Sequence, residues 1–155
     1  MARDGQESKG FTIVELTLAL AITFVLAAIA IPAWRGYHER ARVKRSIAEL
    51  SLLADRIGAF ELENRVFPGS LTEIGASGLR DPWGGPYQYL RIAGPNPPNR
   101  GQLRKDKNLV PINTDFDLYS MGPDGDTKKP LTAKASRDDV IRANDGAFFG
   151  TAVDY

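Results

Sequence analysis

The sequence predicts an α+β fold in which one long amino-terminal helix packs on a small antiparallel β-sheet. Residues 11–34 form a nearly continuous apolar run, and apolar residues continue at helical spacing to about residue 64. Beyond residue 80, short runs that alternate apolar and polar side chains lie between turns rich in Gly and Pro, which is typical of strands. The helix is therefore expected to come first and the sheet to follow it.

Composition and charge exclude several classes of function. The chain has 155 residues, which suggests one domain with appendages, and its net charge of +1 indicates no nucleic-acid partner. It has no cysteine, which excludes disulfides, thiol catalysis and cysteine-ligated zinc. The single histidine, His38, has no nucleophile beside it, and there is no phosphate-binding loop or zinc spacing. We therefore expect no enzyme.

The apolar run is long enough to cross a membrane. Leu16 to Trp34 holds no charged residue, and with residues 11–15 it reaches the length of a bilayer span. The run is too long and the preceding segment too neutral for a secretory signal peptide. A plain membrane anchor explains the length but not Glu15, because a carboxylate inside a membrane segment is costly.

Residues 10–16 (Gly-Phe-Thr-Ile-Val-Glu-Leu) resemble the processing motif of the type IV pilin and type II secretion pseudopilin superfamily. The resemblance implies a pilin-like fold and cleavage by a prepilin peptidase between Gly10 and Phe11, with N-methylation of Phe11. Residues 1–10 would then be a leader, and Glu15 would become the fifth residue of the mature chain, where the family carries Glu.

The same resemblance gives residues 11–34 a role in assembly. A buried carboxylate needs a partner, and the new amine of Phe11 on a neighbouring subunit can approach Glu15 and select one axial register. The alternative is an acid that is solvated among lipid headgroups. Pro32 also matches a proline of the family, and because it lacks an N–H we expect it to kink or loosen the helix.

Residues 35–64 form the amphipathic half of the helix, whose apolar face suits packing on a globular domain. Five basic residues, between positions 35 and 45, open this half. They either contact membrane lipid or acidic neighbours, or form a solvated face. The positive-inside rule would place the carboxyl-terminal side in the cytoplasm. The resemblance implies the reverse: a single-pass inner-membrane protein with its carboxyl-terminal domain in the periplasm.

Residues 65–155 are expected to form a globular β domain. A capping-box pattern at residues 70–73 predicts a short helix near 71–76. Strands are predicted over residues 87–92 and 115–120, with a surface loop over 94–108 between them. After residue 142, we expect a turn and an aromatic pair over the sheet.

Residues 81–90 (Asp-Pro-Trp-Gly-Gly-Pro-Tyr-Gln-Tyr-Leu) resemble a segment of the major, or G-type, pseudopilins. Trp83 within this segment is expected to fill space between the helix and the sheet. Residues 120–126 (Ser-Met-Gly-Pro-Asp-Gly-Asp) resemble the start of the calcium loop in the same family.

The resemblance implies a calcium site, since calcium takes six to eight oxygen ligands from carboxylates, carbonyls and water. The implied ligands are the carboxylates of Asp124, Asp138 and Asp139, more weakly Asp126, and the backbone oxygen of Met121. Residues 127–137 depart from the family's pattern, because a lysine-containing segment replaces a loop rich in glycine and acids. The alternative is a set of solvated turn aspartates paired with lysines.

The resemblance implies that the chain is a structural subunit of a periplasmic type II secretion pseudopilus, which assembles through its amino-terminal helix and helps to export folded proteins. The implied partners are further copies in a helical filament, minor pseudopilins, an inner-membrane assembly platform, a prepilin peptidase and membrane lipid. Two alternatives remain: a type IV pilus pilin used in adhesion, twitching or DNA uptake, and a membrane-anchored binding module that does not polymerise.

Overall fold

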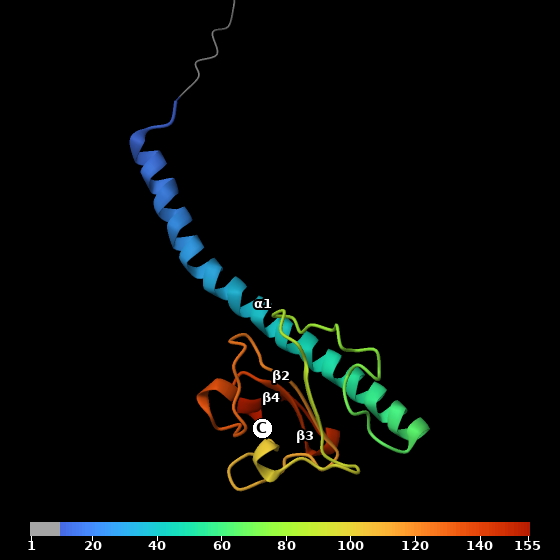
Figure 1. The fold of residues 1–155 in the computed structure, drawn as a ribbon. Helices are drawn as coiled ribbons and strands as arrows, with labels where there is room; N and C mark the ends of the chain where they lie inside the picture. Colours follow the sequence, from blue (N-terminus) through green and yellow to red (C-terminus); the bar gives the residue numbers. More distant parts are fainter. Residues whose placement is uncertain (1–9) are drawn as a thin grey trace, which may run out of the picture. The chain divides into compact units, whose positions relative to one another are not determined.

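The computed structural model describes residues 10–155, and it confirms the predicted α+β fold (Figure 1). Its elements are helix α1 (Ile13–Asn64) and strands β1 (Gln88–Arg91), β2 (Phe116–Ser120), β3 (Val140–Ala143) and β4 (Phe148–Thr151). Four short 3₁₀ segments lie at Arg100–Gln102, Lys134–Ser136, Asn144–Gly146 and Ala152–Asp154. The chain divides into two compact units, one that ends at Glu39 and one that begins at Arg40.

The first unit contains the apolar half of α1. The large apolar side chains of this half are exposed, for example Ile13 at 82 % and Phe24 at 70 %. The helix continues through Pro32 without a break, so the proline does not end it. By length and composition, α1 is the one helix in the described part of the chain that could cross a membrane.

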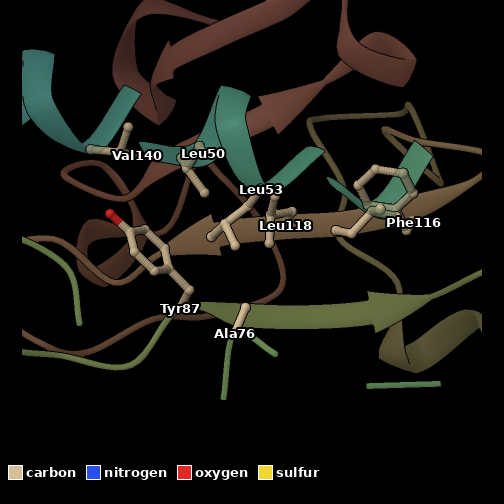
Figure 2. Packing of buried hydrophobic residues seen from close by; sticks show 8 residues of the cluster. Leu50, Leu53, Ala76, Tyr87, Phe116, Leu118 and Val140 are labelled. Carbon is tan, nitrogen blue, oxygen red and sulfur yellow. The ribbon is translucent and has the colours of Figure 1, made fainter. Parts of the chain in front are cut away.

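The second unit contains the amphipathic half of α1, which packs on the sheet. Leu50, Leu53 and Ile57 follow one another at three- and four-residue spacing, and each is at most 1 % exposed. They meet Phe116 and Leu118 of β2 in the main core (Figure 2), which also includes Ala76, Tyr87 and Val140. The prediction of one apolar helix face is therefore confirmed.

The sheet is antiparallel throughout, with the strand order β1-β2-β3-β4. Side chains of β2 alternate between its two faces, as in any strand. Leu118 belongs to the core beneath the helix, whereas Tyr119 belongs to a second core with Ile141 of β3. Segments outside the strands contribute Ile112, Leu131 and Ala152 to this second core. Both faces of the sheet are thus covered.

The predicted strands at 87–92 and 115–120 are confirmed as β1 and β2. The predicted helix at 71–76 is wrong, because this segment forms successive turns. Glu73 accepts a hydrogen bond from the Gly69 N–H instead of completing a capping box with Ser70, and Gly75 has a positive φ of 68° that interrupts any helix.

The hairpin of β3 and β4 was not predicted. Its turn contains Asn144 and Asp145, both in the left-handed region with φ of 52° and 53°. These are the residue types that adopt this conformation most readily after glycine. The residue types at 144 and 145 therefore indicate a turn. The short strands on either side of it do not alternate clearly between apolar and polar side chains, because Arg142 lies in the interior.

Candidate functional site

The amino-terminal end of α1 is organised by Glu15 and Thr12. The Glu15 Oε2 atom accepts hydrogen bonds from the Thr12 N–H (2.9 Å) and the Thr12 hydroxyl (2.8 Å). The Thr12 hydroxyl oxygen in turn accepts a hydrogen bond from the Glu15 N–H (3.2 Å). This reciprocal arrangement is a capping box, which satisfies backbone donors at the start of a helix. This capping role of Glu15 was not predicted beside its role in assembly, although the Thr-x-x-Glu spacing is a signal for it.

The capping box fixes a carboxylate close to the predicted new amino terminus. Gly10 and Phe11 lie just before α1 and are exposed, while residues 1–9 of the predicted leader lie outside the described residues. An anionic side chain in the first turn is favoured by the helix dipole. The structure thus brings the Glu15 carboxylate together with Thr12. Thr12 directly follows Phe11, which would be the first residue after the predicted cleavage. Pro32 lies further along α1.

Trp83 and Asp81 anchor the turn before β1. Trp83 is half-buried and packs against the main core, as expected. Asp81, which is 5 % exposed, was missed as a structural residue. Its Oδ1 accepts the N–H groups of Trp83 and Gly85 (3.0 and 2.8 Å), and its Oδ2 accepts the Ser120 hydroxyl at 2.5 Å. The signal was an aspartate that directly precedes a Pro- and Gly-rich turn.

Two of the predicted calcium ligands, Asp124 and Asp138, lie near each other. The Asp124 N–H donates to Asp138 Oδ2 over 3.4 Å, while Asp124 Oδ1 accepts the Asp126 N–H at 2.9 Å. Asp126 Oδ1 accepts the N–H of Thr127 (2.8 Å). Asp124 and Asp126 are exposed and Asp138 is half-buried. Met121, which was expected to offer its backbone oxygen, is half-buried directly after β2.

The third predicted ligand, Asp139, is completely buried and pairs with an arginine. Its Oδ2 accepts hydrogen bonds from Arg104 Nη2 (2.5 Å) and the Thr127 hydroxyl (2.6 Å). Burial raises the pKa of the Asp139 carboxyl above its usual value, although the hydrogen bond from Thr127 and the charge of Arg104 oppose this. A divalent cation at Asp139 would therefore lie beside a guanidinium of the same sign.

These residues fit a calcium ion poorly. Among the described residues, no three or more His, Cys, Asp or Glu side chains are placed to hold a metal ion. The Oδ1 atom of Asp139 has no hydrogen-bond partner among residues 10–155, which is what a vacant metal ligand would show. The Nε atom of Arg104 also lacks a hydrogen-bond partner among these residues. The two atoms without partners therefore belong to one ion pair, in which the charges of Arg104 and Asp139 balance. Calcium stays a prediction.

Two buried arginines were not singled out from the sequence. Arg104, 2 % exposed, comes from the segment 94–108 that was predicted to be a surface loop. Arg142 of β3 is 5 % exposed, donates to both carboxylate oxygens of Asp115 (2.8 and 2.5 Å) and lies over the Phe116 ring at 3.9 Å. No sequence signal separates these arginines from solvated ones.

The chain is similar in sequence to known proteins whose names fit a pilin-like arrangement of helix and sheet. No protein-family model and no solved structure matches the chain. Curated relatives include the "Type II secretion system core protein G" of Pectobacterium carotovorum subsp. carotovorum, 26 % identical over 79 % of this chain and 81 % of the relative, and that of Klebsiella pneumoniae, 27 % identical over 77 % and 88 %. The "Type IV major pilin protein PilE" of Neisseria gonorrhoeae is 26 % identical over 89 % of this chain and 86 % of its own.

The names of these relatives describe structural subunits and not enzymes, which agrees with the fold. The long apolar amino-terminal helix and the four-stranded antiparallel sheet are the pilin-like arrangement that the sequence predicts. Helix α1 suits a single-pass membrane anchor. The chain therefore has a pilin-like arrangement, and its similarity to these relatives supports a filament subunit of the superfamily of type IV pilins and type II secretion pseudopilins.

Proposed function

We propose that this chain is the major subunit of a periplasmic type II secretion pseudopilus. The observation that carries the proposal is similarity to core protein G of this secretion system in four bacteria, over 77–79 % of the chain. Residues 81–90, whose Asp81 and Trp83 order the turn before β1, are the segment that resembles the G-type family. The subunit would help to export folded proteins across the outer membrane.

Assembly would depend on the charge at the start of α1. Cleavage after Gly10 by a prepilin peptidase would create an N-methylated amine on Phe11, one residue before the capping box. The Glu15 carboxylate is already oriented by Thr12 through Oε2. The cationic amine of a neighbouring Phe11 would neutralise this carboxylate where lipid and apolar side chains surround it, and thereby select one register between subunits.

Before assembly, the subunit would be anchored in the inner membrane by α1, with residues 65–155 in the periplasm. The exposed apolar side chains of residues 11–34 support this, because they contact lipid before assembly and neighbouring helices afterwards. The proposed partners are further copies, minor pseudopilins, an inner-membrane assembly platform and the peptidase. The basic residues between 35 and 45 lie where the helix would leave the bilayer, next to lipid headgroups.

The charge proposal is tested with Glu15→Gln. The amide oxygen of glutamine still accepts hydrogen bonds from Thr12, so the capping box is kept while the negative charge is removed. We expect normal membrane insertion but at least about tenfold less filament, since a charged hydrogen-bonded pair contributes about 1.5–3 kcal/mol. Thr12→Val is the matched control: it removes the hydroxyl and keeps the charge. Wild-type filament yield from Glu15→Gln would overturn the charge proposal.

Processing is tested separately by mass spectrometry of the purified native protein. The expected mature mass begins at Phe11 with one added methyl group on its amine. A chain that still carries residues 1–10 in a strain that assembles filaments would contradict this part of the proposal.

A type IV pilus pilin is the second candidate, and similarity to the gonococcal pilin over 89 % of the chain favours it. A deletion strain distinguishes the two: loss of protein export indicates a pseudopilin, and loss of surface fibres indicates a pilin. Deletion of a membrane-anchored module that does not polymerise would cause neither loss of export nor loss of surface fibres. Because the chain has no cysteine, single cysteines introduced into residues 11–30 would crosslink only in a filament.

A further inference from the structure

Arg104 is the largest side chain among those that are fully buried in the described part of the chain. Its guanidinium donates to Asp139 through Nη2 (2.5 Å) and to the Thr127 hydroxyl through Nη1 (3.0 Å). It also lies over the Tyr119 ring, 4.0 Å from the centroid. One cation therefore contacts three parts of the domain: strand β2, the segment that follows it, and the residue before β3.

The backbone of Arg104 is hydrogen-bonded to a second buried carboxylate. Its N–H donates to Asp117 Oδ2 (3.2 Å), and the other oxygen of Asp117 accepts the Asn113 amide (2.9 Å). Asp117 is 1 % exposed, and burial raises the pKa of its carboxyl. Asp117 and Asp139 are thus two buried carboxylates that contact Arg104, one at its backbone N–H and one at its guanidinium, and a cation close to both lowers the cost of burying them.

The segment 127–137 is where the resemblance predicts a calcium loop. In this chain Thr127 and Asp139, near its two ends, are joined by a hydrogen bond and share Arg104. Ser136 closes the same segment, because its hydroxyl accepts the Lys128 N–H (2.7 Å) and donates to the Lys128 carbonyl (2.8 Å). The ion partner of Asp139 is therefore an arginine from another segment, and not a lysine of the loop.

We propose that Arg104 is the built-in cation of this loop, which takes the place of a bound metal ion, so that the domain folds around Asp139 without calcium. The guanidinium suits this position because it is planar, permanently charged and able to donate to two groups while it stacks on an aromatic ring. The chemistry of the donor set supports the proposal: of the four carboxylates expected to bind calcium, Asp139 is neutralised by Arg104, and no three acidic side chains of the described residues are placed to hold a metal ion.

The first test needs no variant. The thermal unfolding of the full chain in detergent micelles is recorded with millimolar calcium chloride and with a chelator. We expect the two Tm values to agree within about 1 °C, because a ligand that binds only the folded state raises Tm with its concentration. Titration of calcium chloride into the same sample should give no saturable heat. A rise in Tm with calcium, or saturable binding, overturns the proposal.

The second test removes the cation. Arg104→Met keeps most of the side-chain volume and leaves Asp139 buried without a counter-charge, so we expect Tm to fall by more than about 5 °C. Arg104→Met combined with Asp139→Asn should lose less than Arg104→Met alone, since no unpaired charge is then buried. Arg137→Met, at an exposed arginine, is the matched control and should change Tm by less than about 2 °C. An unchanged Tm for Arg104→Met overturns the proposal.

Discussion

The Tyr87 hydroxyl donates a hydrogen bond of 2.5 Å to Glu49 Oε2, across 38 residues of sequence. Tyr87 is a core residue in the segment that leads into β1, and Glu49 lies one residue before the buried Leu50 of α1. Glu49 also accepts a hydrogen bond from Arg45 through Oε1 at 2.7 Å. Burial first, and then the bond to Glu49, raises the pKa of the Tyr87 hydroxyl. The pair therefore links the amphipathic half of α1 to the segment that leads into β1.

Tyr87→Phe should lower the free energy of unfolding by about 1.5 kcal/mol, because it deletes a hydrogen bond to a charged acceptor and leaves Glu49 partly desolvated. Tyr89→Phe is the matched control, since the Tyr89 hydroxyl donates to the neutral Pro68 carbonyl at 2.7 Å. The free energy of unfolding should fall less for Tyr89→Phe, by about 0.5–1 kcal/mol. Urea unfolding followed by tryptophan fluorescence measures both. A larger loss for Tyr89→Phe would show that the acceptor's charge is unimportant.

Gly122→Ala should destabilise the domain by more than about 2 kcal/mol. Gly122 has a positive φ of 66°, and an added Cβ would collide with the backbone carbonyl of Asp138. Gly125 has nearly the same φ, 67°, but open space around its Cβ position. Gly125→Ala should therefore cost only the backbone strain, about 1 kcal/mol. Chemical unfolding of the two variants separates steric collision from strain, and equal losses would contradict the close approach of the two segments.

Asp145→Asn should destabilise the domain more near neutral pH than in acid. The Asp145 carboxylate accepts the Thr114 N–H (2.6 Å) and the Thr114 hydroxyl (2.8 Å). Burial alone would raise the pKa of Asp145, but these hydrogen bonds lower it overall. A lowered pKa means that the folded chain holds this proton less tightly than the unfolded chain. Its contribution is therefore present above the unfolded pKa and is lost as the pH falls through the folded pKa.

Urea unfolding of wild type and Asp145→Asn measures this effect. We expect a difference of about 1 kcal/mol near pH 7, modest because the residue is exposed, and a smaller difference as the pH falls below about 4. Asp55→Asn, at an exposed position of α1, should differ from wild type by less than about 0.5 kcal/mol at either pH. A loss for Asp145→Asn that does not change with pH would assign the effect to shape and not to charge.

The helix and the first two strands could be predicted because their side chains follow a regular period. Leu50, Leu53 and Ile57 mark one helical face, and β2 alternates so that Leu118 and Tyr119 enter different cores. The strand β3 could not be predicted in this way, because Arg142 occupies an interior position that a pattern of apolar residues would not assign to a core.

The candidate site also has one part that could be predicted from the sequence and one part that could not. The Thr12 and Glu15 spacing is local, so the amino-terminal arrangement follows from adjacent residues. The pairing of Arg104 with Asp139 joins positions 35 residues apart, and its partner is decided by the fold. A basic residue in a Pro- and Asn-rich segment is ordinarily solvated, which is why the segment 94–108 was predicted as a surface loop.

The exposed apolar surface of residues 11–34 has a consequence for the thermodynamics of assembly. Lipid tails are as apolar as leucine side chains, so moving this surface from the bilayer into a bundle of like helices removes little or no additional area from water. Burial of apolar area then contributes little to the choice between the two environments. If α1 moves from lipid into a filament, polar interactions such as those of the Glu15 carboxylate would therefore decide the preference more than apolar burial does.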